Sequence, residues 1–260
     1  MKKILVSAIS IVNPVKEGSE IYTTYAKRLI NDVITKTPYD IMVSTNRLDL
    51  FDDIINQNNN RVKIKEVILG DHKTHVGAFN QLLKFYAMKD IDKNYEWLLY
   101  LDCDAGFTTD VDYTQIDNFI DVNEKLGFDM LGLRTDATYE WAENQFIESK
   151  KNNTYYNLFD RKFLFYGVNP EWRKAKLPSE HILLIKNDSR MESMCLEFEK
   201  FCTWFETQEP NRVITFDMES FEIGISALIS GYNMGEMGWG NQCEIFKVGF
   251  NFNNWEKIKR

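Results

Sequence analysis

Two carboxylates separated by one residue follow an apolar run, and they are the strongest candidates for chemistry in this chain. The run is Trp97–Leu101 (WLLYL), and Asp102 and Asp104 come directly after it. Side chains alternate across an extended strand, so both carboxylates lie on the same side if the strand geometry continues. Two anions held that close need a cation or a proton between them. The spacing therefore predicts a bound positive charge at the end of this strand.

Three interpretations of the pair are open. In the first, Asp102 and Asp104 bind Mn²⁺ or Mg²⁺, which also binds the diphosphate of a nucleotide-activated substrate, because these ions prefer carboxylate and phosphate oxygens. In the second, Asp102 is the nucleophile of a haloacid-dehalogenase-type phosphatase, although Gly106 stands where that motif has Thr or Val. In the third, the aspartates only cap a turn. The position after a buried strand favours the metal interpretation.

The elements before the pair alternate between strands and helices. The sequence predicts strands at 4–12, 39–45, 62–69 and 97–101, with helices that begin after Ser19, at 48–55 and at 74–91. Repeated units of this kind predict an α/β fold with a doubly wound, Rossmann-like half. Ligands of such sheets bind beyond the carboxyl ends of the strands, which is where the two aspartates lie.

The second half of the chain is less regular. It predicts strands at 128–135 and 181–187, a helix from Ser189 that is started by a capping box with Glu192, a helix at 216–232, and a glycine-rich loop at 235–242. Residues 136–176 are aromatic and irregular. With no internal repeat and no linker, we expect one domain over 1–260, with a nucleotide-binding half at about 1–135 and an acceptor-binding and catalytic half at about 136–260.

Composition and charge narrow the function classes. A net charge of −8 argues against a broad nucleic-acid-binding face. No apolar run approaches the ~18 residues of a membrane span, and the segment MKKILVSAISIV fits a buried strand better than a secretory signal. The C-terminal NFNNWEKIKR predicts at most a peripheral membrane contact. Four cysteines without a CxxC pair favour a cytoplasmic setting.

The segment YEWLLYLDCDAGF, preceded by a helix that contains Lys84, resembles the DxD hallmark of GT-A glycosyltransferases. The nearest likeness is to the retaining α-galactosyl and N-acetylgalactosaminyl transferases of the blood-group type, and the xylosyl- and galactosyltransferase group is comparably similar at the DxD alone. The resemblance implies a GT-A fold with a mixed central sheet. It also implies hexosyl transfer that depends on Mn²⁺ or Mg²⁺ bound at Asp102 and Asp104. It further implies a nucleotide-sugar donor, with uridine diphosphate as the expected carrier, and a glycan or glycolipid acceptor.

The resemblance also assigns roles to single residues. The segment SAIS contacts the nucleotide in such enzymes, which points to Ala8, Ile9 and Ser10. The segment DMES supplies the essential carboxylate as Glu219, although Met218 is inserted relative to the family's D-E-S. His181, in EHILLIK, corresponds to a residue that contacts a sugar.

Other candidates come from their position along the chain. Lys84 either contacts the diphosphate or is a solvated residue on the helix surface. Asn46 either contacts the base or ribose of the nucleotide or only ends its strand. Asp217 is a catalytic candidate or the N-cap of its helix. Trp239, in GEMGWGNQ, closes over the donor and contacts the acceptor, or lies in an ordinary surface turn. A non-catalytic sugar- or nucleotide-binding protein on the same fold remains an alternative to the enzyme.

Overall fold

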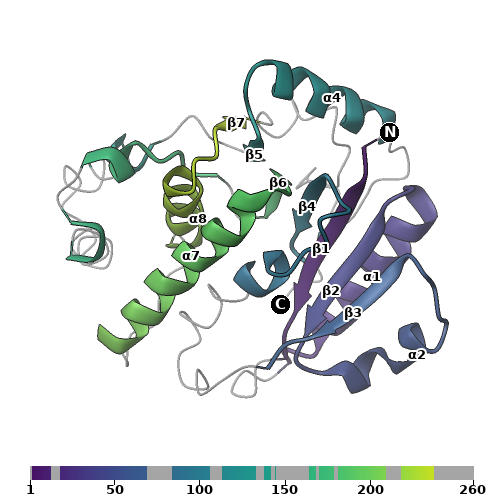
Figure 1. Ribbon diagram of the computed structural model, residues 1–260. Coiled ribbons are helices and arrows are strands. Elements are labelled where there is room, and N and C mark those ends of the chain that lie inside the picture. Colours follow the sequence, from purple (N-terminus) through teal and green to yellow (C-terminus); the bar gives the residue numbers. More distant parts are fainter. Residues whose placement is uncertain are drawn as a thin grey trace.

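The computed structural model describes residues 2–12, 18–68, 84–105, 113–132, 138–141, 144, 164–167, 170–178, 181–208 and 218–236. Within these residues, seven strands form one sheet in the order β3-β2-β1-β4-β6-β5-β7 (Figure 1). The strands are β1 Ile4–Ser10, β2 Asp40–Thr45, β3 Val62–Glu66, β4 Trp97–Leu101, β5 Met130–Gly132, β6 Ile182–Lys186 and β7 Met234–Glu236. The six strands that the sequence predicts are all present, most of them shorter than expected.

The sheet is mixed. Strands β3, β2, β1 and β4 are parallel neighbours, whereas β6 runs antiparallel to both β4 and β5, and β5 is parallel to β7. This arrangement confirms the predicted α/β class, with a Rossmann-like half and a mixed central sheet. The strands β6 and β7 come from the second half of the chain and extend the sheet that the first half begins.

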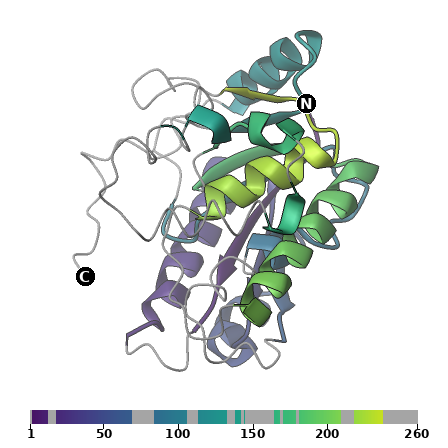
Figure 2. The same cartoon turned by 90° about the vertical axis from the view of Figure 1, so that its left-hand side faces the viewer.

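Helices cover both faces of the sheet. They are α1 Ile21–Lys36, η1 Leu48–Phe51, α2 Asp52–Ile55, α4 Tyr113–Lys125, η3 Pro170–Lys174, α7 Ser189–Gln208 and α8 Met218–Ile229, and residues 84–88 are also helical. One face packs against α1 and α4, and the other packs against residues 84–91, α7 and α8. The helices α7 and α8 lie side by side (Figure 1 and Figure 2).

The central strands are buried on both faces, as their sequences predict. All five residues of β4 and all seven of β1 are buried. Alternate residues of β1 join the two opposite cores, with Val6 and Ala8 on the α1 side and Leu5 and Ile9 on the α7 side. The strand β4 is therefore an interior strand of the sheet, and Asp102 is the first residue after its buried run.

Three local expectations are corrected. Ser19 does not cap α1, which begins after Glu20 without a side-chain cap. At α7 the cap is Asp188, whose Oδ1 accepts a hydrogen bond of 2.9 Å from the backbone N–H of Arg190. The predicted loop at 235–242 begins inside β7, where Gly235 pairs with Leu131 and leaves no room for a Cβ.

The helix α4 was not predicted. None of the described helices combines the length and the apolarity that crossing a membrane requires.

Candidate functional site

The site lies at the end of β4, where the antiparallel partner β6 begins. Leu101 pairs with Ile182, so the next residues outward, Asp102 and His181, face each other across the two strands. The backbone N–H of Asp102 donates a hydrogen bond of 3.1 Å to the carbonyl oxygen of His181. The register of β4 and β6 thus places a carboxylate beside an imidazole from a segment 79 residues away.

Three side chains bind the Asp102 carboxylate. Lys84 Nζ lies 3.2 Å from Oδ1, and the Tyr100 hydroxyl donates to the same oxygen at 2.7 Å. The second oxygen, Oδ2, lies 2.6 Å from Nδ1 of His181. The Asp102 side chain is 23% exposed and that of Lys84 only 5%, so the ion pair between them is largely shielded from water.

This environment keeps Asp102 ionised. Burial alone raises the pKa of the carboxyl, but the charge of Lys84 and the hydrogen bonds from His181 and Tyr100 outweigh burial and lower its pKa to about 2. The ammonium of Lys84 also lies 5.0 Å from the centre of the Tyr100 ring, a cation–π distance. The positive charge that the sequence predicts beside Asp102 is therefore supplied by the protein itself.

Asp104 has a different environment. The strand ends at Leu101, and the chain then turns, with the N–H of Ala105 donating to the carbonyl oxygen of Asp102 at 2.8 Å. The strand geometry that would put both carboxylates on the same side of the sheet therefore ends before Asp104. Asp104 is exposed, and its carbonyl oxygen accepts a hydrogen bond of 3.1 Å from Arg28.

The predicted metal fits Asp102 poorly in this arrangement. Within the described part of the chain, no three His, Cys, Asp or Glu side chains gather as a metal-binding group. A divalent ion on Asp102 Oδ1 would lie ~5 Å from the Lys84 ammonium, a repulsion of about 6 kcal/mol at an effective dielectric constant of ~20. Asp104 is exposed and accessible to an ion, so a metal at this turn stays a prediction. Both oxygens of Asp102 already have partners in the protein.

The predicted donor-binding residues of β1 lie at the same edge of the sheet. Ala8, Ile9 and Ser10 are all buried. The hydroxyl of Ser10 is buried without a hydrogen-bond partner among the residues that the structure describes. Because an unsatisfied buried hydroxyl is costly, we expect a partner for it beyond those residues.

Asn46 links the ends of β1 and β2. Its Oδ1 accepts from the N–H of Val12 and its Nδ2 donates to the carbonyl oxygen of Val12, both at 3.0 Å. The amide thus continues the pairing of the two strands by one step. This geometry favours the interpretation in which Asn46 ends its strand.

The remaining candidates cannot be placed. Asp217 and Trp239 lie outside the described residues, and Glu219 belongs to α8 but its side chain is not among those described. Their catalytic and acceptor-binding roles stay predictions.

Two buried groups with polar contacts were not foreseen. Tyr100 was predicted only as a buried strand residue. A buried tyrosine hydroxyl usually has a hydrogen-bond partner, so the carboxylate two residues later could have indicated this contact. Glu222 of α8 is fully buried and accepts hydrogen bonds from the Tyr166 hydroxyl and from Ser226 Oγ, the latter at 3.3 Å. Burial raises the pKa of Tyr166 well above its usual value.

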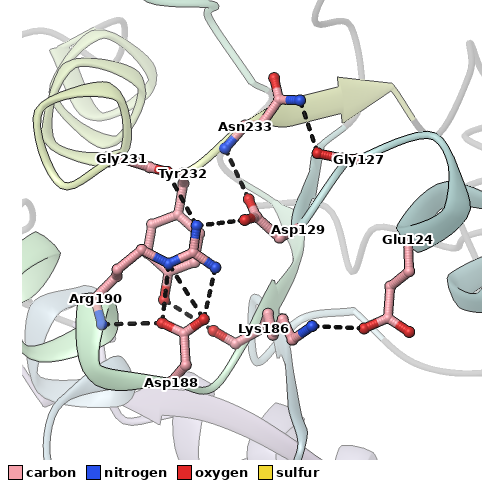
Figure 3. A network of polar contacts seen from close by, with 9 residues as sticks. All are labelled: Glu124, Gly127, Asp129, Lys186, Asp188, Arg190, Gly231, Tyr232 and Asn233. Carbon is pink, nitrogen blue, oxygen red and sulfur yellow. Dashed lines mark hydrogen bonds and ion pairs between the residues drawn. The ribbon is translucent and has the colours of Figure 1, made fainter.

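A second polar network lies at the other end of β6 (Figure 3). Arg190 forms ion pairs with Asp188 and Asp129 and donates to the carbonyl oxygen of Gly231. The guanidinium carbon of Arg190 lies 4.4 Å from the centre of the Tyr232 ring. The hydrogen bond to Asp188 raises the pKa of Arg190. Burial alone would raise the pKa of Asp188, but the hydrogen bonds from Arg190 outweigh burial and lower it. Lys186, at the end of β6 next to this network, pairs with Trp97 at the start of β4. The network therefore lies at the opposite edge of the sheet from Asp102. It links α7 to β5 and β7, and we call it the clamp.

Comparisons with known proteins give a fold likeness only. No protein family and no curated protein matches the sequence. Matching solved structures include 4-diphosphocytidyl-2C-methyl-D-erythritol synthase from Anaerococcus prevotii, 9% identical with a TM-score of 0.39, covering 91% of this chain and 87% of that one. They also include mouse xyloside xylosyltransferase 1 in its apo form, 9% identical with a TM-score of 0.44, covering 91% of this chain and 85% of that one. At these scores the likeness carries no argument about activity, which depends on the geometry of the site.

Proposed function

We propose that this chain transfers a hexosyl group from a nucleotide-sugar, with uridine diphosphate as the carrier, to a hydroxyl of a glycan or glycolipid. The observation that carries the proposal is the ionised Asp102 between Lys84 and His181, at the carboxyl end of the central strand. The carboxyl ends of the parallel strands β1, β2 and β4 share this edge, where open α/β sheets bind their ligands. The buried hydroxyl of Ser10 at the same edge has no partner among the residues that the structure describes, which supports a ligand there.

The residues of the site divide the work by their position. In this proposal Ser10, at the end of β1, contacts the nucleotide, and His181, just before β6, contacts the acceptor. Asp104 is the accessible carboxylate at which Mn²⁺ or Mg²⁺ would meet the diphosphate, and the ion would neutralise charge on the departing group. Retention of configuration would depend on Glu219, with Asp217 as the second candidate. Its carboxylate would stabilise an oxocarbenium-like anomeric carbon or form a glycosyl intermediate, as carboxylates do in glycosidases.

The phosphatase alternative has less support from the geometry. A nucleophilic Asp102 would need an oxygen directed at a phosphorus atom, whereas both of its oxygens accept hydrogen bonds from protein side chains. A non-catalytic binding protein would use the same edge of the sheet, so turnover rather than binding separates it from the enzyme.

The direct experiment measures release of the nucleoside diphosphate. The purified chain is incubated with a panel of uridine diphosphate sugars, with and without saccharide acceptors, and with Mn²⁺ or a chelator. Release that depends on the sugar nucleotide supports the proposal, and loss of release with the chelator supports the metal. Turnover of a generic phosphomonoester would favour the phosphatase, and binding without release from any nucleotide sugar would favour the binding protein.

A further inference from the structure

Asp102 is the shared partner of side chains from three separate segments. Lys84 comes from the helical residues 84–88, Tyr100 from β4, and His181 from the turn before β6. Both carboxylate oxygens are used, one by two donors and the other by the imidazole. The charge of Asp102 is thus neutralised by groups of the protein itself and needs no ion from solution.

Lys84 needs this anion. Its side chain is 5% exposed, and a buried ammonium is stable only beside a counter-charge. A metal ion on Asp102 would compete with Lys84 for the same oxygen and would add a second positive charge beside it. The two uses of Asp102, as counter-ion of Lys84 and as metal ligand, therefore exclude each other in this arrangement.

The contact with His181 fixes which nitrogen carries the proton. An ionised carboxylate only accepts hydrogen bonds, so the 2.6 Å contact between Oδ2 and Nδ1 requires a proton on Nδ1 of His181. In the neutral ring, Nε2 is then the nitrogen with the lone pair. A carboxylate that orients an imidazole in this way is a common supporting contact at functional histidines.

We propose that Asp102 is a positioning residue rather than a metal ligand: it holds Lys84 in the interior and fixes His181 in the form whose Nε2 accepts a hydrogen bond. This inference rests on the proposed function and deepens it. It names Nε2 as the atom of His181 that meets a hydroxyl of the acceptor sugar. It also leaves Asp104 as the one member of the pair to which a metal ion has access.

The test reads the protonation of single ring nitrogens and needs no substrate. The chain has three histidines, so ¹⁵N-histidine labelling and long-range ¹H–¹⁵N spectra resolve each ring, with His181→Asn to assign His181. At neutral pH we expect His181 in the form with the proton on Nδ1. The form with the proton on Nε2 alone, or a ring protonated on both nitrogens, would overturn the inference. The decisive spectrum is that of the unaltered protein, and His181→Asn serves only to assign its signals.

Two perturbations complete the design. In Asp102→Asn we expect the His181 ring to change to a mixture of the two forms, whereas the matched control Asp104→Asn leaves it unchanged. Adding Mg²⁺ together with uridine diphosphate to the unaltered protein should also leave the His181 ring unchanged. Loss of the Nδ1 proton signal on adding Mg²⁺, or a His181 spectrum that ignores Asp102→Asn, would overturn the inference. If the spectra agree but no nucleotide sugar turns over, only the proposed function fails.

Discussion

Replacing Asp102 with asparagine should lower the stability of the protein in a way that depends on pH. The substitution keeps the size of the side chain but removes the negative charge that Lys84 and His181 share. Lys84 is then left in the interior beside a neutral amide. Breaking a buried ion pair from one side is destabilising because the remaining charge stays desolvated.

The size of the effect follows from the pKa of Asp102. Its fall from 3.8 to about 2 on folding means that the folded state binds the carboxylate proton more weakly than the unfolded state does. The contribution to the free energy of unfolding is therefore complete above the unfolded value near 4 and is lost as the pH falls toward 2. At ~1.4 kcal/mol for each pH unit, the contribution is about 2.5 kcal/mol, and in the variant at neutral pH the loss of the Asp102 charge beside the buried Lys84 adds to it.

The assay is urea unfolding followed by tryptophan fluorescence between about pH 2 and pH 7. At pH 7 we expect Asp102→Asn to be about 2–4 kcal/mol less stable than the unaltered protein, and at pH 2 the two should differ by less than about 1 kcal/mol. The matched control is Asp104→Asn, whose exposed side chain should change stability by no more than about 0.5 kcal/mol. Equal acid sensitivity of Asp102→Asn and the unaltered protein would refute the account of the site.

A double-mutant cycle separates the ion pair from other effects. Lys84→Met alone removes the counter-charge of Asp102, and Lys84→Met combined with Asp102→Asn removes both charges. We expect the combined loss to be smaller than the two single losses added together, because the second substitution removes the charge whose ion-pair partner the first substitution removed. Simple additivity would show that the two groups do not interact.

Three further substitutions test separate contacts. Tyr100→Phe removes one donor from the same carboxylate and should cost about 1 kcal/mol in urea unfolding; no loss would show that the hydroxyl contributes nothing. Gly224→Ala places a Cβ 1.9 Å from the carbonyl oxygen of Lys176, so we expect a loss of about 3 kcal/mol or more, or failure to fold, and an unchanged melting temperature would contradict the packing of α8. Arg190→Met breaks the ion pair with Asp129 in the clamp of Figure 3 and should cost about 2–3 kcal/mol; the donor release described above should stay unchanged, since the clamp lies at the other edge of the sheet.

Much of the fold could be read from apolar patterns. The strands β1, β2 and β4 are short apolar runs that end at polar or turn residues, and the buried positions of α7 recur at helical spacing, as in Met191, Met194, Cys195, Phe198 and Cys202. The direction of β6 could not be read, because ILLIK is equally apolar in either orientation. The helix α4 was missed although Ile116 and Ile120 are four residues apart and fully buried, which is a helical signal.

The site was predicted only in part, for reasons of geometry. Asp102 was found because it ends a buried strand. Lys84 was named, but its spacing on a helix could not show that its ammonium is buried against that same carboxylate. His181 was placed on the acceptor side by resemblance, and its contact with Asp102 depends on the antiparallel register of β4 and β6, which no local pattern encodes.

The spacing of two aspartates does not by itself decide what neutralises them. In an extended strand the two carboxylates would share one side and one counter-ion, but the chain turns after Leu101 and gives each its own surroundings. Asp102 then meets Lys84 and His181 from distant parts of the sequence, and Asp104 stays at the surface. Whether a carboxylate is open to an ion therefore depends on whether the fold has already provided a cation beside it. We expect the proposed metal dependence to respond to Asp104→Asn and the orientation of His181 to respond to Asp102→Asn.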